Sequence, residues 1–437
     1  MNALASRPSD VLGGADVVLL GVGVETLTVL PHLHDVEVGR VRVVEAASPT
    51  PEQAATLSHH GIDPTALLDE VPERADVVLR SPGFPRHRDD VDAIYASCRL
   101  GTTPTGLWLA TRGPRRTVVV TGTKGKSTTA TLIAAGLEYC GLDSFLAGNI
   151  GTAAWRHDPQ RDGVAVVELS SYQGADLLTT GEVAVLTLLA DDHIDWHGSA
   201  AAYRHDKLRI LDPSSGDSGD GFPGVVRLAL EGQDLPEPLS SAVTRVAAAG
   251  DYRARNLALA VAAVRAEAAL RGHEAPSVDE LTSVLGVHYP DLASRFEVVP
   301  SDDGIVWIDD ALGSNPSATA AGLERLTPGP AVLIAGGHDR GVSLDPVLDA
   351  LGHWPAGSLT VVWLGDRADH RVSALAESAA IDRVVPVASM GDAVASAASV
   401  AGDGWTVLFS PLAPTERAEG NWSTRSAAFR QAIDRRT

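Results

Sequence analysis

The chain has 437 residues, 44% of them hydrophobic, and at about 150 residues per domain this length predicts about three domains with buried cores. The formal net charge of -21 argues against a general nucleic-acid or anionic-membrane surface, and no apolar run reaches the roughly 18 residues of a membrane span. The N-terminus has no signal-peptide pattern, and the two cysteines, Cys98 and Cys140, fit neither a zinc site nor a disulfide framework, which favours a cytoplasmic protein.

The N-terminal part alternates buried strands with helices. Residues 16–28 predict a strand, a glycine-rich turn and the start of a helix, and residues 40–46 predict a second strand that contains Glu45. Residues 75–85 are a third apolar run, which ends at a Ser-Pro-Gly turn. Such alternation predicts a parallel sheet, so we expect a Rossmann-like domain over residues 1–112.

A phosphate-binding loop is predicted after the next strand, residues 116–122. The loop reads Thr121-Gly122-Thr123-Lys124-Gly125-Lys126-Ser127-Thr128 and leads into an Ala/Leu-rich helix. Backbone N–H groups at a helix N-terminus favour a polyanion; the Lys126 ammonium would reach the β- and γ-phosphates of ATP, and the Ser127 hydroxyl would bind Mg²⁺. The strict Walker spacing is not met, because Val120 occupies the place of its first glycine. A Gly/Lys surface turn is the alternative interpretation.

Lysine is scarce in this chain. Lys124, Lys126 and Lys207 are the only lysines, and the rest of the 35 basic residues are arginine. Lysine is normally among the commonest residues, so we expect these three to occupy positions that need a primary amine or a compact charge. A chance placement is the alternative.

Polar residues with ligand chemistry follow further strands. Residues 164–169 predict a buried strand that carries Glu168 near its end, and the polar side chains downstream include Asp192, His193, His197 and Lys207. A carboxylate at a strand end beside a nucleotide loop is a natural Mg²⁺ ligand, because Mg²⁺ prefers oxygen ligands. Taken singly, each residue has an ordinary alternative, a solvated carboxylate or a surface histidine.

The rest of the chain predicts a closing helix of the central domain, at residues 253–270, and then a third α/β region. Strand-like segments resume at residues 304–310, 330–337, 358–366 and 405–411. The predicted fold class is therefore α/β with three domains. They are a Rossmann-like domain over residues 1–112, a P-loop-type ATPase domain over 113–296 and a second Rossmann-like domain over 297–437.

Together, the motifs resemble those of the Mur ligase family of ATP-dependent amide ligases. The matching segments are GTKGKST (122–128), GNIG (148–151), ELSSYQ (168–173), DDHIDWHG (191–198) and YRHDK (203–207). The resemblance implies that the protein uses ATP and two Mg²⁺ ions. It also implies that Glu168 and His193 hold the second ion.

The same resemblance assigns roles to single residues. Lys207 matches a lysine that family members carry as a carbamate, which needs a primary amine, and would act as a metal ligand. Asn149 would lie near the transferring phosphate, and Asn256 resembles an asparagine on the adenine side of the family's site. The implied catalytic residues are Lys126, Asn149, Glu168, His193 and Lys207. One departure is Leu188, where glutamate-adding members usually have asparagine.

The outer domains resemble those of the glutamate-adding members. The N-terminal domain would bind a UDP-sugar through Gly21, Gly23, Glu45, Ser81 and Gly83, although Glu45 has a solvated strand end as its alternative. The C-terminal domain would hold glutamate through Ser314, Arg340, Thr415 and Trp422. Family members usually have Thr, Lys, Ser and Phe at these four positions, and Leu312 replaces a further family lysine.

The resemblance implies a reaction that joins glutamate to the alanine carboxylate of UDP-N-acetylmuramoyl-L-alanine through an acyl phosphate, in the synthesis of peptidoglycan precursors. The four glutamate-contacting positions differ from the family pattern while the other family motifs are kept. This combination favours L-glutamate, with a separate epimerase as a functional partner; D-glutamate is the alternative. A remoter alternative is a nucleotide-gated binding module without ligase activity, which would predict damage to Glu168, His193 or Lys207. We expect a monomer with no nucleic-acid or membrane partner.

Overall fold

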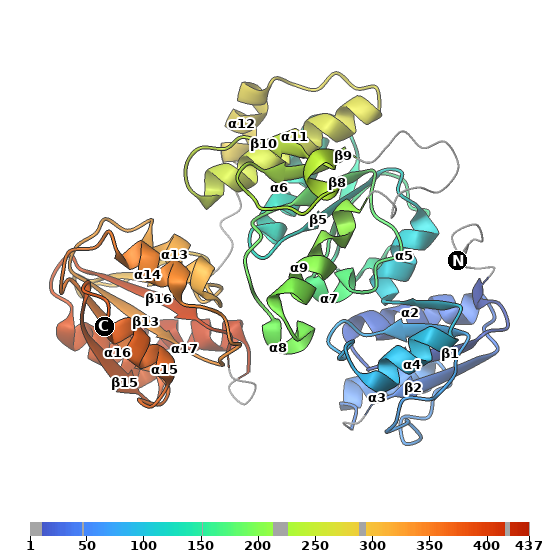
Figure 1. The fold of residues 1–437 in the computed structure, drawn as a ribbon, viewed down its shortest axis with the longest axis horizontal. Coiled ribbons are helices and arrows are strands. Elements are labelled where there is room, and N and C mark those ends of the chain that lie inside the picture. The colour runs from blue at the N-terminus through green and yellow to red at the C-terminus, as the bar shows by residue number, and fades with distance from the viewer. Residues whose placement is uncertain are drawn as a thin grey trace. The chain divides into compact units, whose positions relative to one another are not determined.

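The computed structural model describes residues 11–45, 48–150, 152–212, 226–287, 294–415 and 420–436. The chain divides into two compact units. The first comprises Met1–Asp191 and Trp196–Pro290, and the second comprises Asp192–Asp195 and Asp291–Thr437. The first unit contains two β-sheets and the second contains one, each with its own helices (Figure 1).

A four-stranded parallel sheet begins the first unit, in the order β2-β1-β3-β4. Its strands are β1 (Asp16–Leu20), β2 (Arg40–Val44), β3 (Val77–Arg80) and β4 (Leu100–Thr102). Its helices are α2 (Val24–Asp35), α3 (Pro51–His59), α4 (Asp89–Ser97) and α5 (Pro104–Arg112). Val17 and Leu19 enter one hydrophobic cluster and Val18 and Leu20 another, because successive side chains of a strand point to opposite faces. Both faces are covered, which explains the continuous apolar sequence.

A six-stranded parallel sheet forms the rest of the first unit, in the order β10-β9-β8-β5-β7-β6. Its strands are β5 (Thr117–Thr121), β6 (Ser144–Gly148), β7 (Val164–Glu168), β8 (Val183–Leu186), β9 (Val226–Leu230) and β10 (Thr244–Val246). Its α-helices are α6 (Lys126–Tyr139), α7 (Ser171–Gly174), α8 (Ile194–His197), α9 (Ala200–Leu208), α10 (Leu239–Ala242), α11 (Tyr252–Leu270) and α12 (Val278–Val287). Two short 3₁₀ helices are η2 (Ala154–Arg156) and η3 (Arg209–Leu211).

The two faces of this sheet are covered differently. Val118 and Val120 of β5 pack with residues of α6, α11 and α12, whereas Val119 packs with Trp108 of α5. The preceding residue of α5, Leu107, lies in the core of the four-stranded sheet. Helix α5 therefore contributes to both cores, which explains why the two sheets form one compact unit.

The second unit contains a six-stranded sheet in the order β11-β12-β16-β13-β14-β15. Its strands are β11 (Glu297–Val299), β12 (Val306–Asp309), β13 (Ala331–Gly336), β14 (Leu359–Leu364), β15 (Ile381–Val387) and β16 (Thr406–Leu412). Its helices are α13 (Pro316–Leu323), α14 (Asp345–Leu351), α15 (His370–Ala376), α16 (Met390–Val400) and α17 (Trp422–Asp434). Residues of α13, α14 and α15 cover one face, and residues of α16 and α17 cover the other.

The predicted α/β fold class is confirmed. Neighbouring strands of the three sheets are parallel, apart from the antiparallel pair β11 and β12. The contacts divide the chain into two compact units and do not test the boundaries of the three predicted domains. The boundaries 1–112, 113–296 and 297–437 therefore remain a prediction. Within the described ranges, no helix has both the length and the apolar character needed to cross a membrane.

Candidate functional site

The loop between β5 and α6 has the geometry of a phosphate cradle. Gly122 and Gly125 have φ angles of 148° and 92°, a region that other residues rarely adopt. A Cβ on Gly122 would lie 1.9 Å from Thr187 Oγ1, and one on Gly125 would lie 2.3 Å from Asn256 Oδ1. The glycines therefore allow neighbouring side chains to approach the loop backbone. The loop leads into the 14-residue helix α6, whose N-terminus favours an anion.

The backbone of this loop accepts hydrogen bonds from Thr187, directly after β8, and from a lysine of the loop itself. Thr187 Oγ1 donates to the Lys124 carbonyl at 2.6 Å, and Lys126 Nζ donates to the Thr123 carbonyl at 3.1 Å. Thr128 is buried, whereas Lys124, Gly125, Lys126 and Ser127 remain partly accessible. The predicted nucleotide residues 122–128 are thus brought together, and Lys126 and Ser127 lie at the accessible part of the loop.

The departure at Leu188 leaves the local backbone hydrogen bonds intact. The Leu188 carbonyl accepts a hydrogen bond from Thr123 N at 2.6 Å, and Leu188 forms a β-bridge with Lys124. Asn256, from the second turn of α11, is buried against Gly125. The sequence placed Asn256 on the nucleotide side through a resemblance, and the structure brings it to the phosphate loop.

Glu168 has the geometry of a cation ligand. It is the last residue of β7 and is 1% exposed. Its Oε1 accepts a hydrogen bond from Asn149 Nδ2 at 2.8 Å, while its Oε2 is buried without a hydrogen-bond partner in the described part of the chain. A buried carboxylate oxygen without a partner is costly, and a Mg²⁺ ion is a partner of the right chemistry. Glu168 and Asn149 therefore fit a site for Mg²⁺.

Helix α9 brings Lys207 to the phosphate loop. Lys207 is 3% exposed, and its Nζ donates to the Gly122 carbonyl at 2.6 Å. One turn earlier in the same helix, the Tyr203 hydroxyl lies 2.7 Å from Thr123 Oγ1. The Y-x-x-x-K spacing thus places both side chains on the helix face that contacts the loop.

A second cradle lies at the carboxyl ends of β1 and β3, where the strand order of the four-stranded sheet reverses. A Cβ on Gly21 would lie 3.0 Å from Ser81 Cβ, and one on Gly23 would lie 2.4 Å from Ser81 Oγ. The Glu45 carboxylate accepts a hydrogen bond from Val22 N at 3.0 Å, so it is bound to this turn. Ligands of open α/β sheets bind at such reversal points. Gly83 follows Ser81 in the adjoining turn.

Two buried links between the sheets of the first unit were not predicted from the sequence. Arg80 Nε donates to Asp176 Oδ2 at 2.6 Å, with both side chains buried. Gln173 Nε2 donates to Glu25 Oε1 at 2.7 Å, and its Oε1 accepts from Ser170 N. Burial raises the pKa of the Glu25 carboxyl, and hydrogen bonds from Thr105 and Gln173 partly offset that rise. The SSYQ motif pointed to Gln173, but nothing local identified Glu25 as its partner.

In the second unit, Arg340 contacts the residues that precede α8. Its Nη1 donates to His193 Nδ1 at 2.8 Å and lies 3.3 Å from Asp192 Oδ1, while Asn315 Nδ2 donates to Asp192 Oδ2 at 2.9 Å. His193 has a φ of 51°, which is unusual for a residue other than glycine. Ser314 and Arg340 line one small hollow, so the structure brings these two predicted glutamate contacts together.

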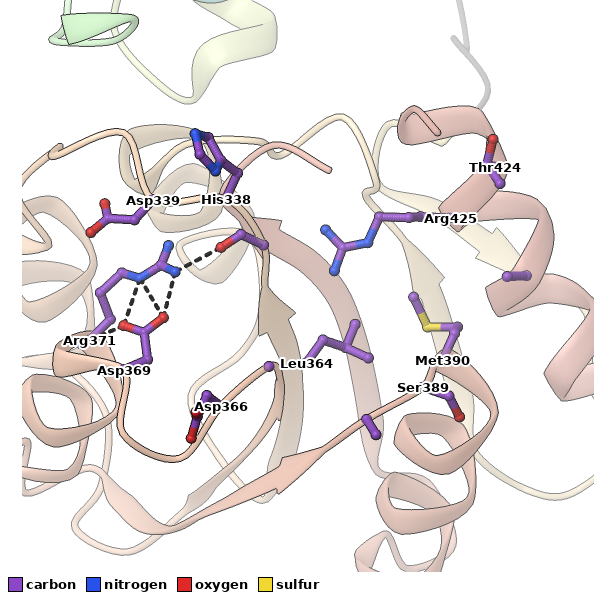
Figure 2. A pocket seen from close by; sticks show the side chains of 14 residues that line it. His338, Asp339, Leu364, Asp366, Asp369, Arg371, Ser389, Met390, Thr424 and Arg425 are labelled. Atoms are coloured by element: carbon purple, nitrogen blue, oxygen red, sulfur yellow. Dashed lines mark hydrogen bonds and ion pairs between the residues drawn. The ribbon is translucent and has the colours of Figure 1, made fainter. Parts of the chain in front are cut away.

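A larger cavity of about 580 Å³ lies at the carboxyl ends of β13, β14 and β15 (Figure 2). Arg371 of α15 is joined to Asp369 in this view, and Arg425 of α17 extends into the cavity from the other side. Thr415 and Trp422 are not among the described residues that line this cavity or the smaller hollow. Trp422 is 41% exposed and begins α17.

Two segments of the chain match models of known protein families. Residues 120–219 match the Mur ligase middle domain, and residues 294–412 match the glutamate ligase domain of Mur ligases. The two segments contain the phosphate loop, Glu168, Lys207 and Arg340.

Individual proteins are also similar over most of the chain. The chain is 30% identical to the UDP-N-acetylmuramoyl-L-alanine--L-glutamate ligase of Salinispora tropica, with 82% of this chain and 83% of that protein covered. It is 32% identical to the UDP-N-acetylmuramoylalanine--D-glutamate ligase of Frankia casuarinae, with 96% and 94% covered. The fold is similar to that of the MurF ligase from Thermotoga maritima in complex with ADP, with a TM-score of 0.55, 14% identity and 100% of both chains covered.

Proposed function

Because the chain belongs to the Mur ligase family of ligases, we propose that it uses ATP to join glutamate to the alanine carboxylate of UDP-N-acetylmuramoyl-L-alanine, in peptidoglycan precursor synthesis. The names of its relatives support this substrate pair. The observation that carries the proposal is the buried Glu168 oxygen, which has no hydrogen-bond partner among the described residues and lies on a strand that pairs with the strand leading into the phosphate loop. A nucleotide-dependent acyl transfer needs these two features together.

The proposed chemistry has two steps. An oxygen of the alanine carboxylate attacks the γ-phosphorus of ATP, the bond from that phosphorus to the bridging oxygen breaks, and ADP leaves. The glutamate amine then attacks the acyl carbon of the acyl phosphate, inorganic phosphate leaves, and the amine loses a proton. Lys126 and the loop N–H groups stabilise the negative charge on the transferring group, and bound Mg²⁺ supplies further charge neutralisation. Glu168, Ser127 and, as a carbamate, Lys207 would hold the ion.

We propose in addition that Lys207 acts as a carbamate, formed when its neutral amine adds CO₂ and releases one proton. The carbamate would supply negative oxygen atoms beside the Gly122 carbonyl to which the amine now donates. A Lys207→Ala variant should lose activity and regain part of it in the presence of short carboxylates, whereas Lys207→Ala with undiminished activity would contradict this role.

The enantiomer of the added glutamate is proposed to be L. The Leu312 side chain has no charge at the position that resembles a family lysine, and the Arg340 guanidinium is a planar group with several donors rather than a point charge. These changes alter how a dicarboxylate can be held, while Ser314 and Arg340 still line one hollow. An L-glutamate product would require a separate epimerase wherever the cell wall contains D-glutamate.

The experiment offers UDP-N-acetylmuramoyl-L-alanine and Mg-ATP together with L-glutamate or D-glutamate in separate reactions, and the product is identified by mass. Product with L-glutamate alone is the expected result, whereas product with D-glutamate alone would assign the chain to the alternative activity. ATP hydrolysis without any product, and without stimulation by glutamate, would support a nucleotide-gated binding module instead.

A further inference from the structure

His197 connects two helices of the proposed active site. It is the last residue of α8 and is 2% exposed. Its Nδ1 lies 2.8 Å from Asp206 Oδ2, and its Nε2 lies 3.0 Å from Ser171 Oγ. When Nδ1–H donates to the Asp206 carboxyl group, Nε2 accepts from the Ser171 hydroxyl. One imidazole thereby contacts both neighbours.

The two residues that His197 connects lie beside the residues proposed to hold Mg²⁺. Ser171 is the first residue of α7 and follows Glu168 after two intervening residues. Asp206 directly precedes Lys207 in α9. A hydrogen bond to each of these residues therefore constrains both the Glu168 segment and the Lys207 helix.

The backbones of α7 and α9 approach each other closely at the same place. A Cβ on Gly174 would lie 2.4 Å from the Asp206 carbonyl oxygen. At this spacing, a small shift of either helix changes the separation of the groups next to it, because packed interiors transmit strain. Because His197 contacts Ser171 of α7 and Asp206 of α9, it helps to fix the spacing between these two helices.

The surroundings of His197 favour a bridge over a separate metal site. His87, His197 and Asp206 offer ligand atoms within 4.8 Å of one another. Both ring nitrogens of His197, however, already have hydrogen-bond partners, and Trp196 and Tyr203 contact the ring. The imidazole is therefore fixed in position by contacts on several sides.

We propose that His197 is a positioning residue that sets the spacing of Glu168 and Lys207, and thereby the affinity of the site for a divalent cation. It acts through its contacts with Ser171 and Asp206. The inference rests on the proposed function, because it takes Glu168 and Lys207 as the groups that hold the ion.

The test measures binding of Mn²⁺, as a probe for Mg²⁺, to the full chain with ADP, by electron paramagnetic resonance. His197→Ala is expected to raise the Kd for Mn²⁺ about tenfold or more, as when a residue behind a metal ligand is lost. His197→Asn can keep the contact with Asp206, and His197→Gln can keep the contact with Ser171, so both should have intermediate Kd values. Adding Ser171→Ala to His197→Ala should cause little further change, because the two residues share one interaction.

The matched control is His205→Ala, on the exposed side of α9, which should leave the Kd for Mn²⁺ unchanged. Unfolding midpoints show whether each variant folds, and if His197→Ala does not, the Asn and Gln variants carry the test. A folded His197 variant with wild-type Mn²⁺ affinity would overturn the inference. Failure of the wild-type chain to make product with either glutamate would instead contradict the proposed function, and the Mn²⁺ measurement would distinguish the two results.

Discussion

At the scale of single residues, the two oxygens of the Glu168 carboxylate have different environments. Oε1 accepts from Asn149, and Oε2 is buried with no partner in the described ranges. A polar atom in that state lowers stability unless a ligand compensates for it. The buried Oε2 therefore lowers the stability of the folded chain, and it is also the atom that the proposed chemistry assigns to a metal ion.

The Glu168→Gln variant separates loss of metal binding from loss of nucleotide binding. The substitution keeps the shape of the side chain and the acceptor for Asn149, but it replaces Oε2 with an amide nitrogen, which cannot bind Mg²⁺. We expect ligase turnover to fall at least about 100-fold while ADP binding without metal is retained. Ligase turnover is measured with each glutamate enantiomer, and ADP binding is measured by calorimetry. Glu138→Gln, on the exposed side of α6, is the control. Wild-type turnover in Glu168→Gln would remove Glu168 from the mechanism.

Glu267 is a buried carboxyl that should make stability depend on pH. Burial, and then repulsion by Glu182, raise its pKa from 4.5 to about 7, and Arg271 offsets only part of the rise. Because the folded chain holds the proton more tightly than the unfolded chain, the stability that this group contributes is present below pH 4.5. It is lost as pH rises to about 7.

Glu267→Gln removes this titration. Relative to wild type, its free energy of unfolding should increase between about pH 5 and pH 7, by at most about 3 kcal/mol, and then stay level. Urea unfolding over this range measures the difference. A constant difference at all pH values would mean that Glu267 does not titrate in this window.

At the scale of elements, two helices hold one glycine turn of the second unit. Arg425 of α17 donates to the Gly336 carbonyl at 3.0 Å, and Arg371 of α15 donates to the Gly337 carbonyl at 2.7 Å. A Cβ on Gly337 would lie 2.4 Å from the Pro414 carbonyl oxygen. The turn that leads to Arg340 is thus fixed by contacts from two helices and from the residues after β16.

Arg425→Gln should loosen this turn. We expect the KM for glutamate to rise about tenfold, the change that corresponds to loss of one charge-assisted hydrogen bond, with a smaller effect on the KM for ATP. Steady-state kinetics with each substrate varied in turn measure both constants. Arg367→Gln is the control, because Arg367 is exposed and directly follows Asp366, which lines the cavity of about 580 Å³. An equal rise in both constants would contradict a local effect on the glutamate site.

At the scale of the whole molecule, the chain consists of two compact units. The phosphate loop and Asn256 lie in the first, and the hollow lined by Ser314 and Arg340 lies in the second. A ligand stabilises the part of a protein that binds it. The nucleotide and the amino acid should therefore protect different peptides.

Hydrogen exchange measured by mass spectrometry tests this division. Mg-ADP alone should slow exchange in peptides from residues 117–139 and 252–270, and leave residues 331–364 unchanged. The Lys126→Ala chain, which lacks the ammonium proposed to contact the phosphates, should show much weaker protection. Protection confined to the second unit would place the nucleotide elsewhere.

The sequence alone determined the α/β class and the glycine-rich loop between a strand and a helix. Apolar runs, glycine turns and strand–helix alternation are local, so they could be read without knowing which segments meet. The same holds for the spacing of Tyr203 and Lys207 within one helix.

Only the tertiary structure decided which side chains meet across the chain. Arg80 and Asp176 are 96 residues apart, and Glu25 and Gln173 are 148 apart. The partners of His197 likewise come from two other helices. Strand order and helix packing bring such residues together, and neither is a property of a short segment. The sequence therefore showed which residue types were available for chemistry, and the packing of distant elements determined which residues hold them in place.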